Sequence, residues 1–258
     1  EAVALASVGG KDGTLDPRIE RLSASGKVLW SYVEQHKGLD VTSGALALTT
    51  NAAPLLTYTH IATFPGVTHH LVTLTPGGQK VAAFSWSTPQ VDRGEVSSVR
   101  ALASGRTAVQ SHSDAQHASA TWKGQYNFGL RVLDADLKPV YNDAVSALAP
   151  EVERGLLELP SGDLLIIGRE KRYKPNAKTR FLARRVSATP QKVWRHLGAF
   201  GDVGVDLALA PAGQIAVIGE SGAEIEIGSD DPNMQRDCWV GAMDDLGNVQ
   251  WKTVLDRG

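Results

Sequence analysis

A repeat of about 55 residues constrains the fold of this chain more than any other feature. In each copy an apolar residue is followed by a short polar turn and then by a bulky side chain. The clearest copies end in tryptophan, at Leu22–Trp30, Val186–Trp194 and Met243–Trp251, and weaker copies lie at Leu74–Phe84 and Leu133–Tyr141. A repeat of this length that is built from short alternating segments is typical of a ring of β-sheet blades.

A second hairpin signal precedes each of the last four copies. Two apolar runs flank Ser161-Gly162 in GLLELPSGDLLIIG and Ala212-Gly213 in VDLALAPAGQIAVIG, as expected for two antiparallel strands joined by a tight turn. Similar signals surround Ser104-Gly105 and, less regularly, residues 51–54. Each unit therefore reads as strand A, tight turn, strand B, longer loop, strand C, tight turn and strand D.

We predict an all-β fold, with residues 1–258 forming a single β-propeller domain of about five four-stranded antiparallel blades. Its units cover approximately 1–34, 39–86, 95–142, 151–195 and 203–252. Only strands B, C and D are visible in the first unit, so the first blade is incomplete. Either residues before Glu1 complete it, or the ring closes by packing alone, or the units are part of a larger ring.

The tryptophans that close the repeats, Trp30, Trp194 and Trp251, are expected to pack between neighbouring blades, because a large aromatic at a fixed place dominates local core packing. Composition adds three exclusions. A net charge of −2 gives no general attraction to nucleic acid, and no apolar run reaches the roughly 20 residues of a membrane span. A single cysteine, Cys238, excludes an internal disulfide and cysteine-based zinc sites.

The segment AMDDLGNVQW, at 242–251, resembles the PQQ-like and related bacterial β-propeller repeats, which share a strand reading roughly aLD-dGk-lW. Leu22–Trp30 and Val186–Trp194 match this pattern more loosely, and Leu133–Asp136 supplies only the acidic turn. The resemblance implies a propeller fold. With five units and one cysteine, it points to the non-catalytic relatives, which act as assembly or recognition platforms, and not to quinone-cofactor enzymes. It also implies a bacterial periplasmic or secreted protein without a cofactor.

Blade topology places the A–B and C–D turns on one face of the fold and the longer B–C and D–A loops on the other. The longer loops differ in every unit, and loops on a rigid scaffold are common binding sites. We therefore expect a non-enzymatic scaffold that recognises a protein partner through the B–C and D–A loops. The residues expected to contact this partner are Arg169, Lys171, Arg172, Lys174, Lys178, Arg180, His69, His70, Phe64, Trp122 and Tyr126.

The basic loop at 169–180 has an acidic counterpart at 220–237. These two loops either pair with each other, at a gain of under about 1 kcal/mol for each exposed ion pair, or leave the basic loop to steer an acidic partner.

Two alternative functions remain open. One is a propeller that binds carbohydrate or another small ligand, with Phe64, Trp86, Trp122 and Tyr126 as stacking surfaces. The other is a glycoside hydrolase, which needs two carboxylates roughly 5–10 Å apart, for which Asp40, Glu95 and Asp206 are the candidates.

Standard catalytic motifs are absent from the sequence, which favours a non-enzymatic function. His112, Asp114 and His117 are metal-ligand residue types within six positions, but no second cluster accompanies them, so no metal site is predicted.

Overall fold

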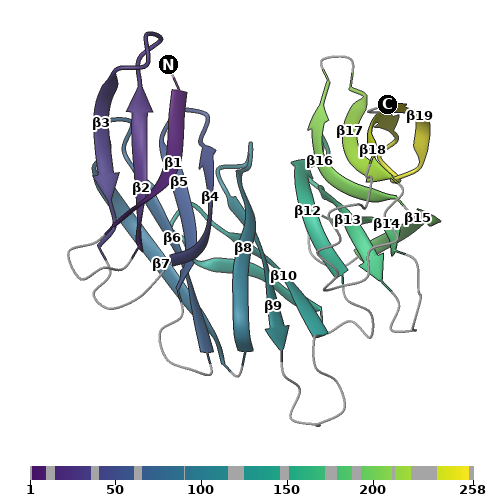
Figure 1. Ribbon diagram of the computed structural model, residues 1–258, viewed down its shortest axis with the longest axis horizontal. Helices are drawn as coiled ribbons and strands as arrows, with labels where there is room; N and C mark the ends of the chain where they lie inside the picture. Colours follow the sequence, from purple (N-terminus) through teal and green to yellow (C-terminus); the bar gives the residue numbers. More distant parts are fainter. Residues whose placement is uncertain are drawn as a thin grey trace. The chain divides into compact units, whose positions relative to one another are not determined.

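The computed structural model describes residues 2–9, 15–35, 41–60, 66–89, 91–115, 125–145, 151–171, 179–187, 193–200, 202–210, 213–221 and 237–255. These ranges contain nineteen strands, arranged in five antiparallel sheets (Figure 1). Contacts between Cα atoms group the chain into two compact units, Glu1–Val145 and Ser146–Gly258. The assignment of residues 1–258 to a single domain stays a prediction.

Unit 1 contains three sheets, and in each of them consecutive strands pair in chain order. The first sheet has three strands: β1 (Ala2–Gly9), β2 (Leu15–Leu22) and β3 (Val28–Val33). The second has four: β4 (Val41–Leu48), β5 (Pro54–His60), β6 (Gly66–Leu74) and β7 (Lys80–Pro89). The third also has four: β8 (Val91–Ala101), β9 (Thr107–Ala115), β10 (Gln125–Leu133) and β11 (Pro139–Val145).

Unit 2 contains two sheets of four strands with the same order and the same antiparallel pairing. One holds β12 (Glu151–Glu158), β13 (Leu164–Lys171), β14 (Thr179–Val186) and β15 (Val193–Phe200). The other holds β16 (Val203–Leu209), β17 (Ile215–Ser221), β18 (Asp237–Met243) and β19 (Val249–Leu255). The predicted all-β fold of about five blade-type sheets, the first of them incomplete, is confirmed.

The tight turns that the structure describes repeat one backbone geometry. In the turn from β18 to β19 the N–H of Gly247 donates to the carbonyl of Asp244 at 3.1 Å, and φ of Gly247 is 83°. Glycine occupies this fourth turn position in most of the turns because φ is positive there. Leu137 takes the same position between β10 and β11 with φ at 61°, and it is only 7% exposed.

The turn from β2 to β3 identifies the strand that the first sheet lacks. Like the β18–β19 turn, it is closed by the N–H of its fourth residue, Gly26, which donates to the carbonyl of Ser23 at 3.0 Å. The pairing of β2 with β3 also shifts register directly before the turn, between Arg21 and Leu22, as the pairing of β18 with β19 does between Ala242 and Met243, and no described A–B pair shifts there. By this match β2 and β3 are strands C and D, β1 is strand B, and no strand A precedes β1 among the described residues.

The hydrophobic cores lie between neighbouring sheets within each unit. In the strand B of unit 2 that begins the core, Leu164, Leu165, Ile166 and Ile167 of β13 are all at most 4% exposed, so consecutive residues of this strand are buried. In the core of unit 2 the side chain of Phe181 meets Trp239 edge-to-face, with ring centroids 6.1 Å apart. Apolar runs without alternation are expected for strands buried on both faces.

The repeat tryptophans differ in their packing. The indole of Trp30 covers Gly78 in the next sheet, where an added Cβ would lie 2.7 Å from the ring, and its Nε1 donates to the carbonyl of Pro76 at 3.0 Å. The predicted packing between blades is confirmed for Trp30. It is wrong for Trp251, which is 51% exposed, because no described strand of unit 2 follows β19. The side chain of Trp194 lies outside the described residues.

Candidate functional site

Most of the residues predicted to bind a partner either lie outside the described ranges or have side chains that the structure does not describe. The same holds for two carboxylates of the hydrolase alternative and for the weak metal candidates. Residues outside the described ranges are Asp40, Phe64, His117, Trp122, Arg172, Lys174 and Lys178. Residues placed in strands whose side chains are not described are Glu95, His112, Asp114, Tyr126 and Lys171. All of these assignments stay predictions.

The two predicted histidines of β6 have partners inside unit 1. His69 is 1% exposed, and its Nδ1 is hydrogen-bonded to Thr59 Oγ1 at 2.9 Å. This burial argues against a role for His69 in contacting a partner. His70 is half-buried, its ring stacks on Tyr58 with centroids 4.7 Å apart, and its Nδ1 is hydrogen-bonded to Ser85 Oγ at 2.7 Å.

The aromatic surface expected for sugar stacking is covered where the structure describes it. The guanidinium carbon of Arg131 lies 4.8 Å from the ring centroid of Trp86 and 5.8 Å from that of Phe84. Its Nε and Nη2 also donate to Asn142 Oδ1, at 3.3 and 3.2 Å. Partial burial lowers the pKa of Arg131 below its usual range. A cation already placed over Trp86 leaves that face less accessible to a sugar ring.

Other predicted residues in unit 2 are half-buried. Arg169 of β13 and Arg180 of β14 each interact with other groups of the protein, so neither is a free charge of an exposed loop. Asp206 lies beside an irregularity in the pairing of β16 with β17, and its Oδ1 accepts the N–H of Leu207 at 2.9 Å. Its side chain thus has a local structural role.

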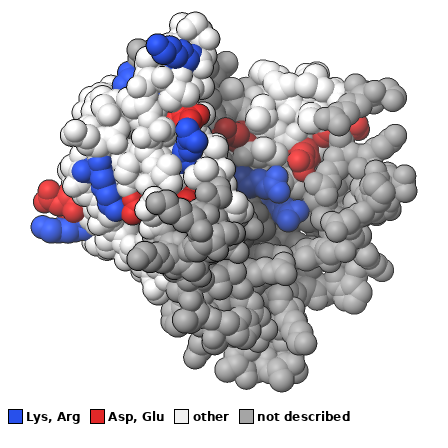
Figure 2. All heavy atoms as spheres, turned by 60° about the vertical axis from the view of Figure 1, so that its left-hand side comes forward, with Lys and Arg blue, Asp and Glu red and all other residues white. Residues whose placement is uncertain are grey.

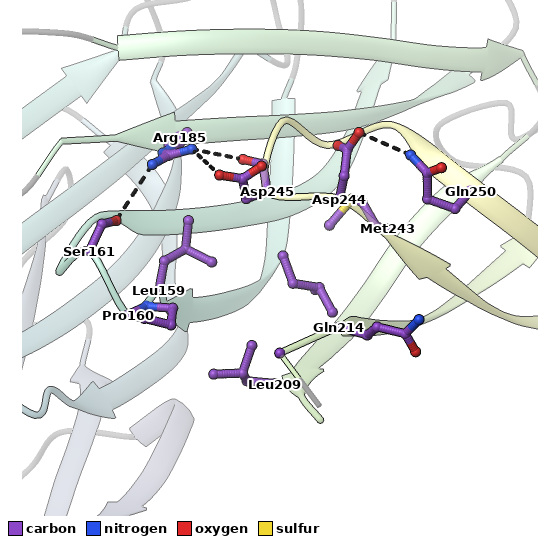
Figure 3. Close-up of a pocket in the computed structure, with 12 residues that line it drawn as sticks. Leu159, Pro160, Ser161, Arg185, Leu209, Gln214, Met243, Asp244, Asp245 and Gln250 are labelled. Carbon is purple, nitrogen blue, oxygen red and sulfur yellow. Dashed lines mark hydrogen bonds and ion pairs between the residues drawn. The ribbon is translucent and has the colours of Figure 1, made fainter. Parts of the chain in front are cut away.

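A cavity of about 510 Å³ lies in unit 2 on the face formed by the A–B and C–D turns, which the sequence analysis had not selected (Figure 3). Four segments line it: Leu159–Ser161 after β12, Arg185 near the end of β14, the turn from β16 to β17, and the turn from β18 to β19. Because all four belong to unit 2, the cavity is a feature of this unit alone.

The floor of the cavity is apolar. Leu159, Ile215 and Met243 contribute to it and are 5%, 2% and 2% exposed, while Leu209 at its edge is 38% exposed. Figure 3 shows Leu159 and Leu209 projecting toward the space between the turns. Each of the four residues stands where a strand meets a tight turn, so the repeated strand–turn pattern itself brings apolar side chains to this place.

Arg185 is clamped at the upper edge of the cavity in the view of Figure 3. Its Nε and Nη2 contact Asp163 Oδ2 at 2.8 and 2.7 Å, and its Nη1 donates to Asp245 Oδ2 at 2.8 Å and to the Asp245 carbonyl at 3.2 Å. Burial alone would lower the pKa of Arg185, but the hydrogen bonds and charges of the two aspartates raise it above its usual range. The guanidinium is therefore fixed and its charge is balanced.

Asp244 differs from Asp245 because only neutral groups donate to it. Its Oδ1 accepts the N–H groups of Leu246 and Asn248, at 3.0 and 2.8 Å. Its Oδ2 accepts the side-chain amides of Asn248 and Gln250, at 2.9 and 3.0 Å. Burial alone would raise the pKa of Asp244, but these hydrogen bonds bring it below its usual range. Asp244 is thus an ionised carboxylate, and no cation of the described residues is paired with it.

The clamp formed by Arg185 has a counterpart in unit 1. Arg21 Nη1 donates to the carbonyl of Pro76 at 2.7 Å, and Pro76 holds the same position in its C–D turn as Asp245 does in the turn from β18 to β19. Both arginines directly precede the apolar residue that opens the first and fourth repeat copies. This recurrence in the sequence is the signal that could have identified the cavity edge.

Two observations on the described residues concern other kinds of site. No group of three or more His, Cys, Asp and Glu side chains in this part of the chain is placed to hold a metal ion. Figure 2 shows the described Lys and Arg interspersed with Asp and Glu, without a large area of one sign on the described surface of that view.

No helix among the residues described is long and apolar enough to cross a membrane.

Comparison with known proteins shows the fold but not the family. No protein-family model and no curated protein matches the chain. Three solved structures are similar over nearly its whole length. A Hadza microbial sialidase has TM-score 0.61 and 9% identity and covers 95% of this chain, which spans 53% of that protein. A protein of unknown function from Dyadobacter fermentans has TM-score 0.57 and 11% identity, covering 98% of this chain and 82% of its own.

The third structure is a thermostable family-43 glycoside hydrolase with TM-score 0.50 and 10% identity, covering all of this chain and 96% of its own. Together with the five blade-type sheets, these likenesses define the class of the fold, a multi-blade β-propeller.

Proposed function

We propose that this chain is a non-catalytic binding module and that unit 2 holds a small ligand in the cavity between its turns. The observation that carries the proposal is the cavity itself, with an apolar floor and a rim of fixed polar groups. Small-molecule sites typically enclose about 300–1,000 Å³ and combine apolar walls with a few placed polar groups, and the cavity fits this description.

The apolar floor supplies affinity in this proposal. A ligand group that covers Leu209 and contacts Met243 removes apolar surface from water, and full burial of a group the size of a leucine side chain contributes about 1.5–3 kcal/mol. The rim supplies orientation, because Arg185 and Asp244 are held in place by several hydrogen bonds each.

The chemistry of the rim supports binding and not hydrolysis. A carboxylic acid that donates a proton to a leaving group needs a raised pKa, whereas the pKa of Asp244 is lowered. Asp245, the other carboxylate of the lining, is paired with Arg185. The solved sialidase and the family-43 hydrolase support the fold only. The hydrolase alternative stays a prediction, because Asp206 is the only one of its candidates with a described side chain, and its Oδ1 accepts the N–H of Leu207.

Recognition of a protein partner through the B–C and D–A loops remains a separate prediction. It rests on the dissimilar loops and on the resemblance of 242–251 to PQQ-like repeats, which we retain as a proposal for the relationship of the chain. Most of the residues expected to make that contact lie outside the described ranges or have undescribed side chains.

A substitution at the edge of the cavity tests the binding proposal. Leu209→Trp places a larger ring over the apolar floor, and Leu48→Trp is the matched control, since Leu48 also ends a strand A and is 47% exposed, but in unit 1. Binding of 3-phenylpropan-1-ol is measured by chemical-shift titration of the whole chain. We expect unit 2 amides around the cavity to shift, and Leu209→Trp to weaken this binding at least about tenfold. Unaltered binding in Leu209→Trp, or no binding at all, contradicts the proposal.

A further inference from the structure

The charges that surround the cavity do not balance. Arg185 is the only cation in the described lining, and Asp163 and Asp245 already contact it. Asp244 adds a third carboxylate, whose four hydrogen bonds all come from backbone or side-chain amides. The edge of the cavity therefore carries excess negative charge directly above an apolar floor.

From this imbalance we infer that the cavity selects small primary amines in which an alkylammonium group is joined to an apolar body. The inference rests on the proposed function and adds the chemical class of the ligand. In this arrangement the apolar body covers Leu209, Met243 and their neighbours, and the ammonium lies at the rim near Asp244 and Asp245.

Hydrogen-bonding capacity at the rim points to the same class. The Nε2 of Gln250 donates to Asp244, which leaves the Oε1 of that amide as an acceptor. The side chain of Asp245 is 59% exposed, and its Oδ2 takes the bond from Arg185, which leaves Oδ1 for a ligand. An alkylammonium brings three donors and no acceptor, so it matches a rim that offers oxygen atoms.

The expected selectivity is moderate because the rim is open to water. A charge about 4 Å from a carboxylate gains only about 1 kcal/mol in water and about 4 kcal/mol at the effective dielectric of a protein surface. With screening by salt, we expect an amine to bind about five- to tenfold more tightly than the alcohol of the same shape. A carboxylate of the same shape should bind more weakly than the alcohol, since like charges repel.

Three probes with one apolar body test the inference: 3-phenylpropylamine, 3-phenylpropan-1-ol and 3-phenylpropanoate. Each is titrated into the unmodified chain and into the Asp244→Asn variant at neutral pH, with chemical shifts as the readout. We expect the order amine, alcohol, acid in the unmodified chain. In Asp244→Asn the advantage of the amine over the alcohol should fall to about twofold or less, because the amide carries no charge.

The chain itself supplies a matched control for the loss of the turn cap. Asp134 caps the turn from β10 to β11 as Asp244 caps its own, since Asp134 Oδ1 accepts the N–H groups of Asp136 and Lys138 at 3.0 and 2.8 Å. Asp134→Asn lies in unit 1, so it should leave all three affinities unchanged.

A salt titration of the unmodified chain keeps the inference testable if Asp244→Asn does not fold. Raising the ionic strength should weaken binding of the amine and leave binding of the alcohol unchanged. Equal affinities for the three probes, or an amine affinity insensitive to salt, would overturn the selection of amines while leaving the cavity as a binding site. Binding of none of the probes would instead overturn the proposed function.

Discussion

Replacing Arg185 by methionine should destabilise unit 2 by about 2–3 kcal/mol, because the guanidinium joins two turns that are far apart in the sequence. Asp163 supplies the larger part. Its side chain is 18% exposed and that of Arg185 is 22% exposed, and a charged hydrogen-bonded pair with this degree of burial contributes about 2 kcal/mol. Asp245 is 59% exposed, so its pair adds about 0.5 kcal/mol. Methionine keeps most of the apolar stem, which limits losses from packing.

Urea unfolding at neutral pH measures this effect, with hydrogen exchange of β14 and β18 amides to assign the change to unit 2. A double-mutant cycle of Arg185→Met with Asp163→Asn should give a coupling free energy of about 1.5–2 kcal/mol, and the cycle with Asp245→Asn about 0.5 kcal/mol or less. Arg21→Met is the matched control in unit 1. It removes the hydrogen bond to the Pro76 carbonyl, a loss that should cost about 1 kcal/mol. If Arg185→Met costs under about 0.5 kcal/mol, or if coupling to Asp163 is absent, the clamp does not stabilise unit 2.

Three further predictions concern stability. Because the pKa of Asp244 is lowered in the folded chain, its stabilising effect is present above the usual aspartate range and is lost as the pH falls through that lowered pKa. Acid titration of Asp244→Asn should therefore show a shallower loss of stability in that window than the unmodified chain, and identical pH profiles would contradict this. Leu137→Ala should cost about 2 kcal/mol in urea unfolding, since its side chain is 7% exposed, whereas a loss under about 0.5 kcal/mol would show that this turn contributes little to the core. Gly78→Ala should destabilise unit 1 by at least about 2 kcal/mol, because a Cβ there meets the ring of Trp30 and φ is 84°. Gly26→Ala is the control: φ is 81° and nothing lies near the added Cβ, so its cost measures the strain of a positive φ alone.

The fold was predictable because the repeat is local. Each tight turn leaves a recognisable sequence of small and polar residues between two apolar runs, and the pairing of strands then follows from their order along the chain. Strands B, C and D of the first blade were identified in this way. So was the lack of a strand A, which the described part of the first sheet confirms. The exposure of Trp251 was not predictable, because it depends on which sheet follows and not on the repeat in which the residue lies.

The cavity was missed because its walls come from separate turns. Nothing in the sequence near Asp244 shows that Arg185 lies beside Asp245, since their contact depends on the packing of two sheets. His69 illustrates a different error, the misplacement of a strand boundary. We expected a loop, but β6 begins at Gly66, and the side chains of Val67, His69 and Leu71 point to the same buried face. The alternation of these three residues was the available signal.

The pairing of consecutive strands also has a consequence for how the chain folds. Every described sheet is a meander in which each strand pairs with the next one along the sequence, so most native hydrogen bonds close short loops. Chains with such local contacts fold faster than those that must join distant segments, because less loop entropy is lost before the first contacts form. We expect single blades to act as the first ordered elements, with packing between adjacent blades completing each unit afterwards, as in other arrays whose repeats contact mainly their neighbours.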